Sequence, residues 1–131
     1  LACIDPRFPE NTIKYMRGRH LEGKYSQINL AGAGIAAVAP AFEKWRPAFW
    51  ENLAASIQLH QIEKIIVLDH RECGASTIAY GKEANDTPDK ETETHRKALA
   101  EFRAQVKQRH EKLGVETGLM ALDGSVMMFD A

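Results

Sequence analysis

The sequence predicts an α/β fold: a single domain with a mostly parallel central sheet flanked by helices, and a C-terminal hairpin or edge strand. Three observations support this prediction. Residues 64–69 (KIIVLD) are a continuous apolar, β-branched run, typical of a strand buried on both faces. Strand-like and helix-like segments alternate, which favours parallel strands joined by crossover helices. Asp123-Gly124 separates two apolar segments and is a strong hairpin signal.

The individual elements follow from hydrophobic periodicity and from turn residues. We expect strands at residues 1–4, 24–31, 64–69, 118–122 and 125–129. We expect helices at residues 9–20, 47–61, 73–80 and 94–113, the second opened by Pro47 and the last closed by Gly114. Residues 81–92 are polar, contain Pro88, and predict an exposed loop.

The composition limits the class of protein. A chain of 131 residues with 44% hydrophobic content predicts one globular domain over residues 1–131. A net charge of −1 gives no electrostatic case for nucleic acid, and no apolar run reaches the ~18 residues of a membrane span. Two cysteines are too few for a secreted disulfide framework, so we expect a cytoplasmic protein. The chain starts inside an apolar segment without Met, so we expect that native N-terminal residues are missing.

Two short motifs contain both cysteines of the chain. Cys3-x-Asp5-x-Arg7 stands at the start, and His70-x-x-Cys73-Gly74 follows the apolar run at residues 64–69. Two thiolates and an imidazole suit Zn²⁺, and three protein ligands leave a fourth position for water or substrate. Parallel strands present their carboxyl ends at one edge, so Cys3, His70 and Cys73 can meet there if their strands are neighbours.

Other interpretations of these three residues are weaker but open. Two buried cysteines can simply fill core space, and a histidine at a strand end can bond a backbone carbonyl. Ligand type alone also admits Cu(I) or iron.

Asp5 and Arg7 lie two and four residues from the first predicted ligand. They can be a solvated pair in a turn around Pro6. The functional interpretation is that Asp5 accepts a hydrogen bond from metal-bound water or binds the metal itself, while Arg7 holds the carboxylate through a bidentate pair.

The remaining motifs have weaker functional interpretations. Gly32-Ala33-Gly34 opens a G-x-G-x-x-A pattern that admits a dinucleotide-binding turn, although a tight loop lining the metal crevice fits better. We expect the other histidines on the surface or on a helix face, with a proton relay conceivable for the third: His20, His60, His95 and His110. An aromatic cluster predicts core or interface: Phe42, Trp45, Phe49 and Trp50.

The paired motifs resemble those of the β-class carbonic anhydrases, and the resemblance runs over most of the chain. It implies reversible hydration of CO₂ to bicarbonate by a zinc-bound hydroxide. It also implies that Cys3, His70 and Cys73 are the zinc ligands and that Asp5 and Arg7 are the catalytic dyad. A homodimer or higher homo-oligomer is the expected assembly, with CO₂ and bicarbonate as the small-molecule substrates.

The sequence departs from the family pattern at several positions. Pro6 stands where a small residue is usual, Asp69 stands where Gly is common, and residues 29–33 (NLAGA) keep only Ala-Gly of the usual loop. Three alternatives to CO₂ hydration remain open. The chain can be a hydrolase of a CO₂ analogue (COS or CS₂), or a non-catalytic zinc-binding protein in which Asp5 is the fourth ligand. It can also be a nucleotide-binding module that uses Gly32 and Gly34.

Overall fold

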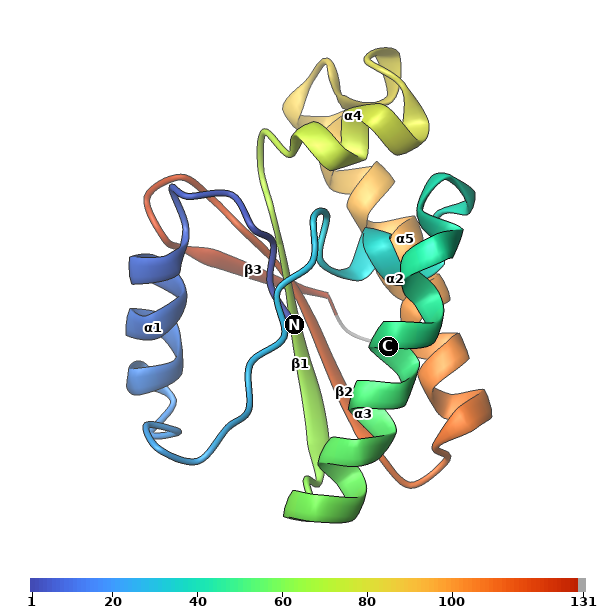
Figure 1. Cartoon of the computed structure of the whole chain (residues 1–131). Coiled ribbons are helices and arrows are strands. Elements are labelled where there is room, and N and C mark those ends of the chain that lie inside the picture. Colours follow the sequence, from blue (N-terminus) through green and yellow to red (C-terminus); the bar gives the residue numbers. More distant parts are fainter. Residues whose placement is uncertain (130–131) are drawn as a thin grey trace.

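A computed structural model describes residues 1–129 of the chain. Its sheet contains β1 (Lys64–His70), β2 (Gly114–Met120) and β3 (Val126–Phe129), in the order β1-β2-β3. β1 and β2 are parallel, and β3 is antiparallel to β2 (Figure 1). The predicted α/β class with a C-terminal hairpin is therefore confirmed.

Helices cover both faces of this sheet. Figure 1 shows α1 on one side, α2, α3 and α5 on the other, and α4 beyond the carboxyl end of β1. The bounds are α1 (Pro9–Gly18), α2 (Gly34–Val38), the 3₁₀ helix η1 (Pro40–Trp45), α3 (Arg46–His60), α4 (Gly74–Tyr80), the 3₁₀ helix η2 (Glu83–Asn85) and α5 (Pro88–Arg109).

The apolar run of β1 is buried on both faces because alternate side chains enter different clusters. Ile65 and Val67 join the main core beneath α2, α3 and α5. Ile66 and Leu68 join a smaller cluster with Phe8, on the side of α1. This double burial explains the continuous apolar pattern and fixes the end of β1, where His70 lies.

The predicted strands at residues 1–4 and 24–31 are wrong as extended strands. Only Ala2 and Asn29 form isolated parallel bridges: Ala2 bridges both Asn29 and Leu68. Beyond Ala2 the chain leaves the sheet and enters a turn at Pro6. The first half of residues 24–31 lines a cavity instead of pairing. The neighbours that the metal-site prediction required, the first segment and β1, nevertheless lie side by side.

The longest helix begins earlier than predicted, so the predicted loop at residues 81–92 is wrong from residue 88 onward. Thr87 caps α5 by accepting a hydrogen bond from Lys90 N at 3.2 Å, and Pro88 occupies the first turn. The helix ends at Arg109, and Gly114 begins β2 rather than capping the helix. The hairpin turn spans residues 121–125, with Gly124 at φ +89°.

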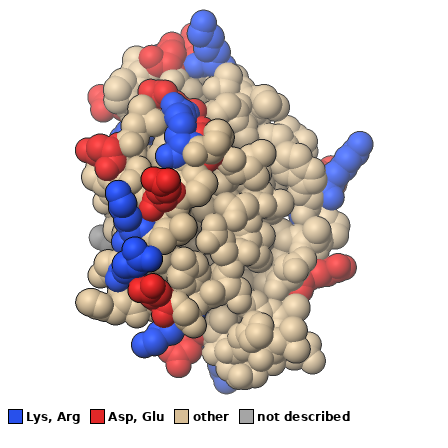
Figure 2. Space-filling model, turned by 60° about the vertical axis from the view of Figure 1, so that its left-hand side comes forward, with Lys and Arg blue, Asp and Glu red and all other residues tan. Residues whose placement is uncertain are grey.

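The aromatic cluster belongs mainly to the core of the chain. Phe42, Phe49 and Trp50 are buried, and only Trp45 is exposed, where it stacks on Phe42. The face drawn in Figure 2 carries acidic and basic side chains interspersed, with no patch of one sign. Within residues 1–129, no helix combines the length and the apolar character needed to cross a membrane.

Glu116 on β2 joins the end of α1 to the sheet, and its replacement tests this packing. Its carboxylate accepts from both Nη atoms of Arg19, at 2.9 and 3.0 Å, and lies 2.7 Å from Lys64 Nζ. The hydrogen bonds from Arg19, aided by Lys64, lower the pKa of Glu116 to about 2. Because this is below the ~4.3 of an unfolded Glu, the stabilisation is present above pH ~4.3 and is lost as the pH falls toward 2.

We expect Glu116→Gln to lower the free energy of unfolding at pH 7 by about 1–2 kcal/mol. Its stability should also depend less on pH between about 4.3 and 2, measured by urea unfolding at several pH values. Glu22→Gln is the control, because Glu22 is exposed and pairs only with exposed Arg17 among the described contacts. Equal stability of the two variants would contradict the role of Glu116.

Candidate metal centre

Three segments bring Cys3, His70 and Cys73 together at the carboxyl end of β1. Leu68 N donates to Leu1 O at 3.0 Å, which sets Cys3 beside the end of the strand. His70 is the last residue of β1, and Cys73 immediately precedes α4. All three residues are buried, and one ligand atom from each lies within 4.8 Å of the others.

The ring of His70 is oriented for a ligand at Nε2. Its Nδ1 lies 2.7 Å from the carbonyl oxygen of Arg71. A carbonyl only accepts, so Nδ1 carries a hydrogen, and in the neutral ring Nε2 presents a lone pair. Nε2 is buried and has no hydrogen-bond partner among residues 1–129. Phe8 stacks on the imidazole at 4.1 Å between ring centroids and holds it against the crevice.

This donor set fits a tetrahedral metal ion. Ligand atoms at 2.0–2.3 Å from Zn²⁺ lie about 3.3–3.8 Å apart, consistent with the compact cluster. A buried nitrogen without a partner is costly unless something binds it. The convergence of two thiols on this unpartnered Nε2 is therefore the observation that favours a metal here.

The two thiols are chemically unequal. The hydrogen bond with Cys73 lowers the pKa of Cys3 below its ordinary value, and the same bond raises the pKa of Cys73. Cys3 is the more acidic partner because Gly32 N also donates to its sulfur, at 3.2 Å. A metal ion that binds both sulfurs must displace the proton they share, so metal binding is coupled to proton release.

Asp5 and Arg7 form the predicted ion pair at the edge of the cluster. Arg7 donates from Nε to Asp5 Oδ1 at 3.1 Å and from Nη2 to Oδ2 at 2.9 Å. These bonds lower the pKa of Asp5 to about 2, so the group is a carboxylate at neutral pH. Asp5 Oδ2 lies 3.8 Å from His70 Nε2, yet Asp5 is outside the three-residue ligand cluster. Arg7 thus holds the carboxylate beside the cluster.

Sequence reasoning missed Glu72 and Glu91, whose hydrogen bonds connect Arg7 to the segment after His70 and to α5. Arg7 Nη1 donates to Glu72 Oε1 at 2.9 Å, and Glu72 N donates to Glu91 Oε2 at 2.6 Å. Arg71 Nη1 also donates to Glu91 Oε1, at 3.0 Å. Glu72 has φ +58°, which is unusual for a residue other than Gly. Glu91 was missed because it falls within residues 81–92, which were predicted to be an exposed loop.

The sequence placed His95 on the surface or on a helix face, and it lies on the buried face of α5. His95 is fully buried, and its Nδ1 lies 2.6 Å from Asp69 Oδ2. Its position in the apolar stripe of α5, four residues before Leu99, was the available signal. The other three histidines also lie as expected: His20 and His60 are exposed and His110 is half-buried.

The Gly32–Gly34 turn lines the metal crevice, as the preferred sequence interpretation held. Gly32 N points to Cys3 Sγ and Gly34 N to Asp69 Oδ1. α2, which follows, is buried along its whole length. Both amides are therefore already used by the protein, which leaves the nucleotide-binding interpretation without donors for a phosphate.

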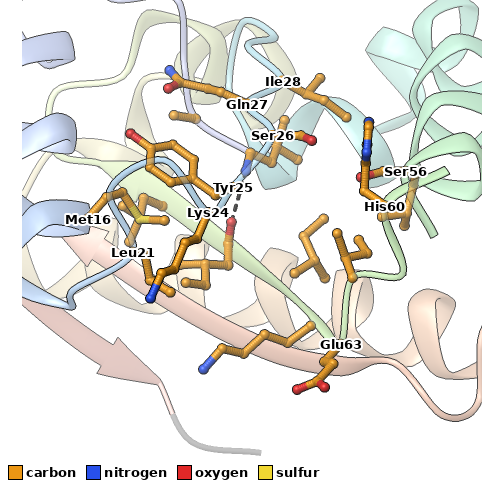
Figure 3. A pocket seen from close by; sticks show the side chains of 18 of the residues that line it. Met16, Leu21, Lys24, Tyr25, Ser26, Gln27, Ile28, Ser56, His60 and Glu63 are labelled. Carbon is orange, nitrogen blue, oxygen red and sulfur yellow. Dashed lines mark hydrogen bonds between the residues drawn. The ribbon is translucent and has the colours of Figure 1, made fainter.

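The larger of the two cavities described runs along β1, and none of Cys3, His70 and Cys73 lines it. It has a volume of about 350 Å³ and is lined by α1, α3 and residues 24–28 (Figure 3). Figure 3 shows Lys24, Tyr25 and His60 around the cavity, and none of the residues that it labels is a cysteine. The chemistry of the donor set, rather than cavity size, therefore identifies the candidate site.

Comparisons with known proteins agree with this geometry. A sequence model of the family described as "Putative carbonic anhydrase" matches residues 1–116. The chain belongs to this family. The resemblance to the β-class carbonic anhydrases is therefore confirmed.

Two curated relatives extend the match to most of the chain. An uncharacterized protein of Rickettsia conorii is 36% identical over 126 residues, which are 96% of this chain and 68% of the relative. An uncharacterized protein of Rickettsia bellii is also 36% identical over 126 residues, which are 77% of that relative.

Two solved structures share the fold of this carbonic anhydrase family member. The carbonic anhydrase of Streptococcus mutans superposes with a TM-score of 0.65 at 18% identity, covering 98% of this chain and 78% of the other. The beta-carbonic anhydrase CcaA gives a TM-score of 0.51 at 16% identity, covering 98% and 77%.

If the cluster binds a metal ion, replacing one of its cysteines should remove most of the bound metal. We expect wild type to take up about one divalent ion per chain and Cys73→Ser to lose most of it, because a hydroxyl is a far poorer ligand than a thiolate. Plasma mass spectrometry of dialysed protein measures the content. Thr77→Ala, an exposed change on α4, is the control. Full occupancy in Cys73→Ser would remove Cys73 from the ligand set.

Proposed function

We propose that the chain catalyses the reversible hydration of CO₂ to bicarbonate at a zinc ion held by Cys3, His70 and Cys73. The observation that carries this proposal is the conjunction of a buried Cys₂His cluster with a carboxylate that Arg7 holds 3.8 Å from the unpaired nitrogen of His70. Bound zinc would lower the pKa of a coordinated water to about 7 and thereby supply hydroxide at neutral pH.

The residues of the chain supply the rest of the chemistry. Asp5 is ionised and lies beside the cluster, so it can accept a hydrogen bond or a proton from a water at the fourth position. Arg7 hydrogen-bonds both oxygens of Asp5 and so restrains the carboxylate beside the cluster, while lone pairs remain for a water. Phe8 and the buried edge of β1 exclude bulk water from one side of the site.

The same geometry weighs against a closed, non-catalytic zinc protein. In such a protein Asp5 would have to join the ligand cluster, and Arg7 would have to release it. In the structure Arg7 makes three hydrogen bonds to Asp5, one of them from its backbone N. A site held in this arrangement has a position for water, which supports the enzymatic proposal.

Two substitutions in the pair test the mechanism. We expect Asp5→Ala and Arg7→Ala each to retain zinc, because the three ligands remain, and to lower CO₂ hydration by at least ~10²-fold, as loss of a proton-handling group does. Stopped-flow hydration with a pH indicator measures the rate, and Arg17→Ala on the exposed face of α1 is the control.

The outcomes separate the candidate functions. If both variants hydrated CO₂ at the wild-type rate, Asp5 and Arg7 would have no catalytic role and would be an ion pair in an ordinary surface turn. A zinc-loaded wild type that is inert toward CO₂ but releases H₂S from COS or CS₂ would replace the proposal with a hydrolase of a CO₂ analogue. Inertness toward all three would favour a non-catalytic zinc protein.

We also propose that the chain works as a homodimer or a larger homo-oligomer in the cytoplasm. Large apolar side chains are exposed near and around the site, among them Ile4 between Cys3 and Asp5, and Ile78 on α4. Both cysteines are free thiols, as a thiolate metal site in a reducing compartment requires.

Assembly can be measured without any assay of activity. We expect sedimentation velocity at micromolar concentration to give at least a dimer, because association would bury these apolar side chains. A stable monomer that hydrates CO₂ would contradict the proposed assembly.

A further inference from the structure

Asp69 and His95 form a buried pair behind the metal centre that the proposed reaction does not use. Asp69 is 1% exposed and His95 is 0% exposed. His95 Nδ1 and Asp69 Oδ2 form a hydrogen bond of 2.6 Å. The other oxygen, Oδ1, accepts from Gly34 N at 2.9 Å. The pair thus joins α5 to the turn before α2.

This turn is held in an unfavourable backbone conformation. Ala33 has φ 50° and ψ −113°, which is outside the allowed regions for a residue with a Cβ. At Gly34 an added Cβ would lie 2.6 Å from Leu99 Cδ2, so the turn is also packed too closely for a side chain. Such a conformation persists only where surrounding contacts enforce it, and the Asp69 carboxylate is one of them.

The other end of the turn reaches a predicted metal ligand. Gly32 N donates to Cys3 Sγ at 3.2 Å, and Gly32 is two residues from Gly34. A shift of the turn at Gly34 therefore moves the donor at Gly32. His95 is thus connected to the Cys3 sulfur through Asp69, the Gly32–Gly34 turn and the Gly32 amide.

We propose that Asp69 and His95 are positioning residues that hold the Gly32–Gly34 turn so that the Gly32 amide hydrogen-bonds the Cys3 sulfur. The inference rests on the proposed function only in requiring that a metal binds Cys3. Two thiolates donate more charge to a metal than two imidazoles would. An amide that bonds one sulfur withdraws part of that charge, and this adjusts both the affinity for the metal and its acidity.

The test replaces His95, because its other ring nitrogen makes no hydrogen bond within residues 1–129. His95→Leu therefore removes the contact with Asp69 alone, whereas His95→Asn keeps a donor close to the position of Nδ1. The probe is Co²⁺ in place of zinc, whose sulfur-to-cobalt charge-transfer absorption reports the charge on the thiolates. Competition with a chromophoric chelator gives the affinity for zinc.

We expect His95→Leu to move the charge-transfer absorption to longer wavelength and to weaken zinc binding by about 10-fold or more, as loss of support around ligands does. His95→Asn should restore most of both properties. Val106→Ala is the control, because it removes buried volume from the same helix face without touching the pair. It should lose stability and leave the absorption unchanged.

A second variant keeps the test decisive if a carboxylate left unpaired prevents folding. Asp69→Ala/His95→Leu removes both partners, so no buried charge remains, and it should show the same change in absorption. Unchanged absorption and zinc affinity in either folded variant would overturn the inference. Wild-type protein that binds cobalt but does not hydrate CO₂ would refute the proposed reaction and leave this inference standing. Wild-type protein that binds neither metal would refute both.

Discussion

The pairing of two residues at the start of the chain with β1 brings the candidate metal ligands together. Cys3 and His70 are far apart in sequence, and only the parallel alignment of residues 1–2 with Leu68 brings them together. Ala2 is inserted between Asn29 and Leu68, so the same alignment also sets the position of the segment that leads to Gly32. The ligands, the turn behind Cys3 and the Asp5–Arg7 pair all depend on this short stretch of pairing.

Charge balance explains why so many ionisable groups are tolerated around one buried cluster. Two thiolates offset the two positive charges of a divalent ion, so a third anionic ligand would leave net negative charge away from water. Arg7 hydrogen-bonds both oxygens of Asp5 and restrains the carboxylate beside the cluster, and Glu72 accepts from Nη1 of Arg7. A zinc ion bound by Cys3, His70 and Cys73 would keep one position for a neutral molecule.

The sequence predicted the α/β class, most helices and the convergence of the cluster, because each depends on strong local patterns. The β-branched run of β1 and the spacing of its His and Cys are examples. The strands at residues 1–4 and 24–31 were overextended, because composition shows which segments suit a sheet and not how many residues find partners. His95 and Glu91 were missed for a similar reason: their partners, Asp69 and residues 71–72, are distant in sequence.

Those two missed residues lie on one face of α5, four positions apart, and both hydrogen-bond residues next to His70. Glu91 binds the side chain of Arg71 and the backbone of Glu72, just after the ligand His70, while His95 binds Asp69, just before it. One turn of α5 therefore hydrogen-bonds residues on both sides of His70, the candidate ligand at the end of β1. The Thr87 cap allows this, because a helix that began at residue 94 would not present Glu91 at all. The ligand strand is thus positioned by a helix rather than by a flexible loop, as a site that must hold three ligand atoms at fixed spacing requires.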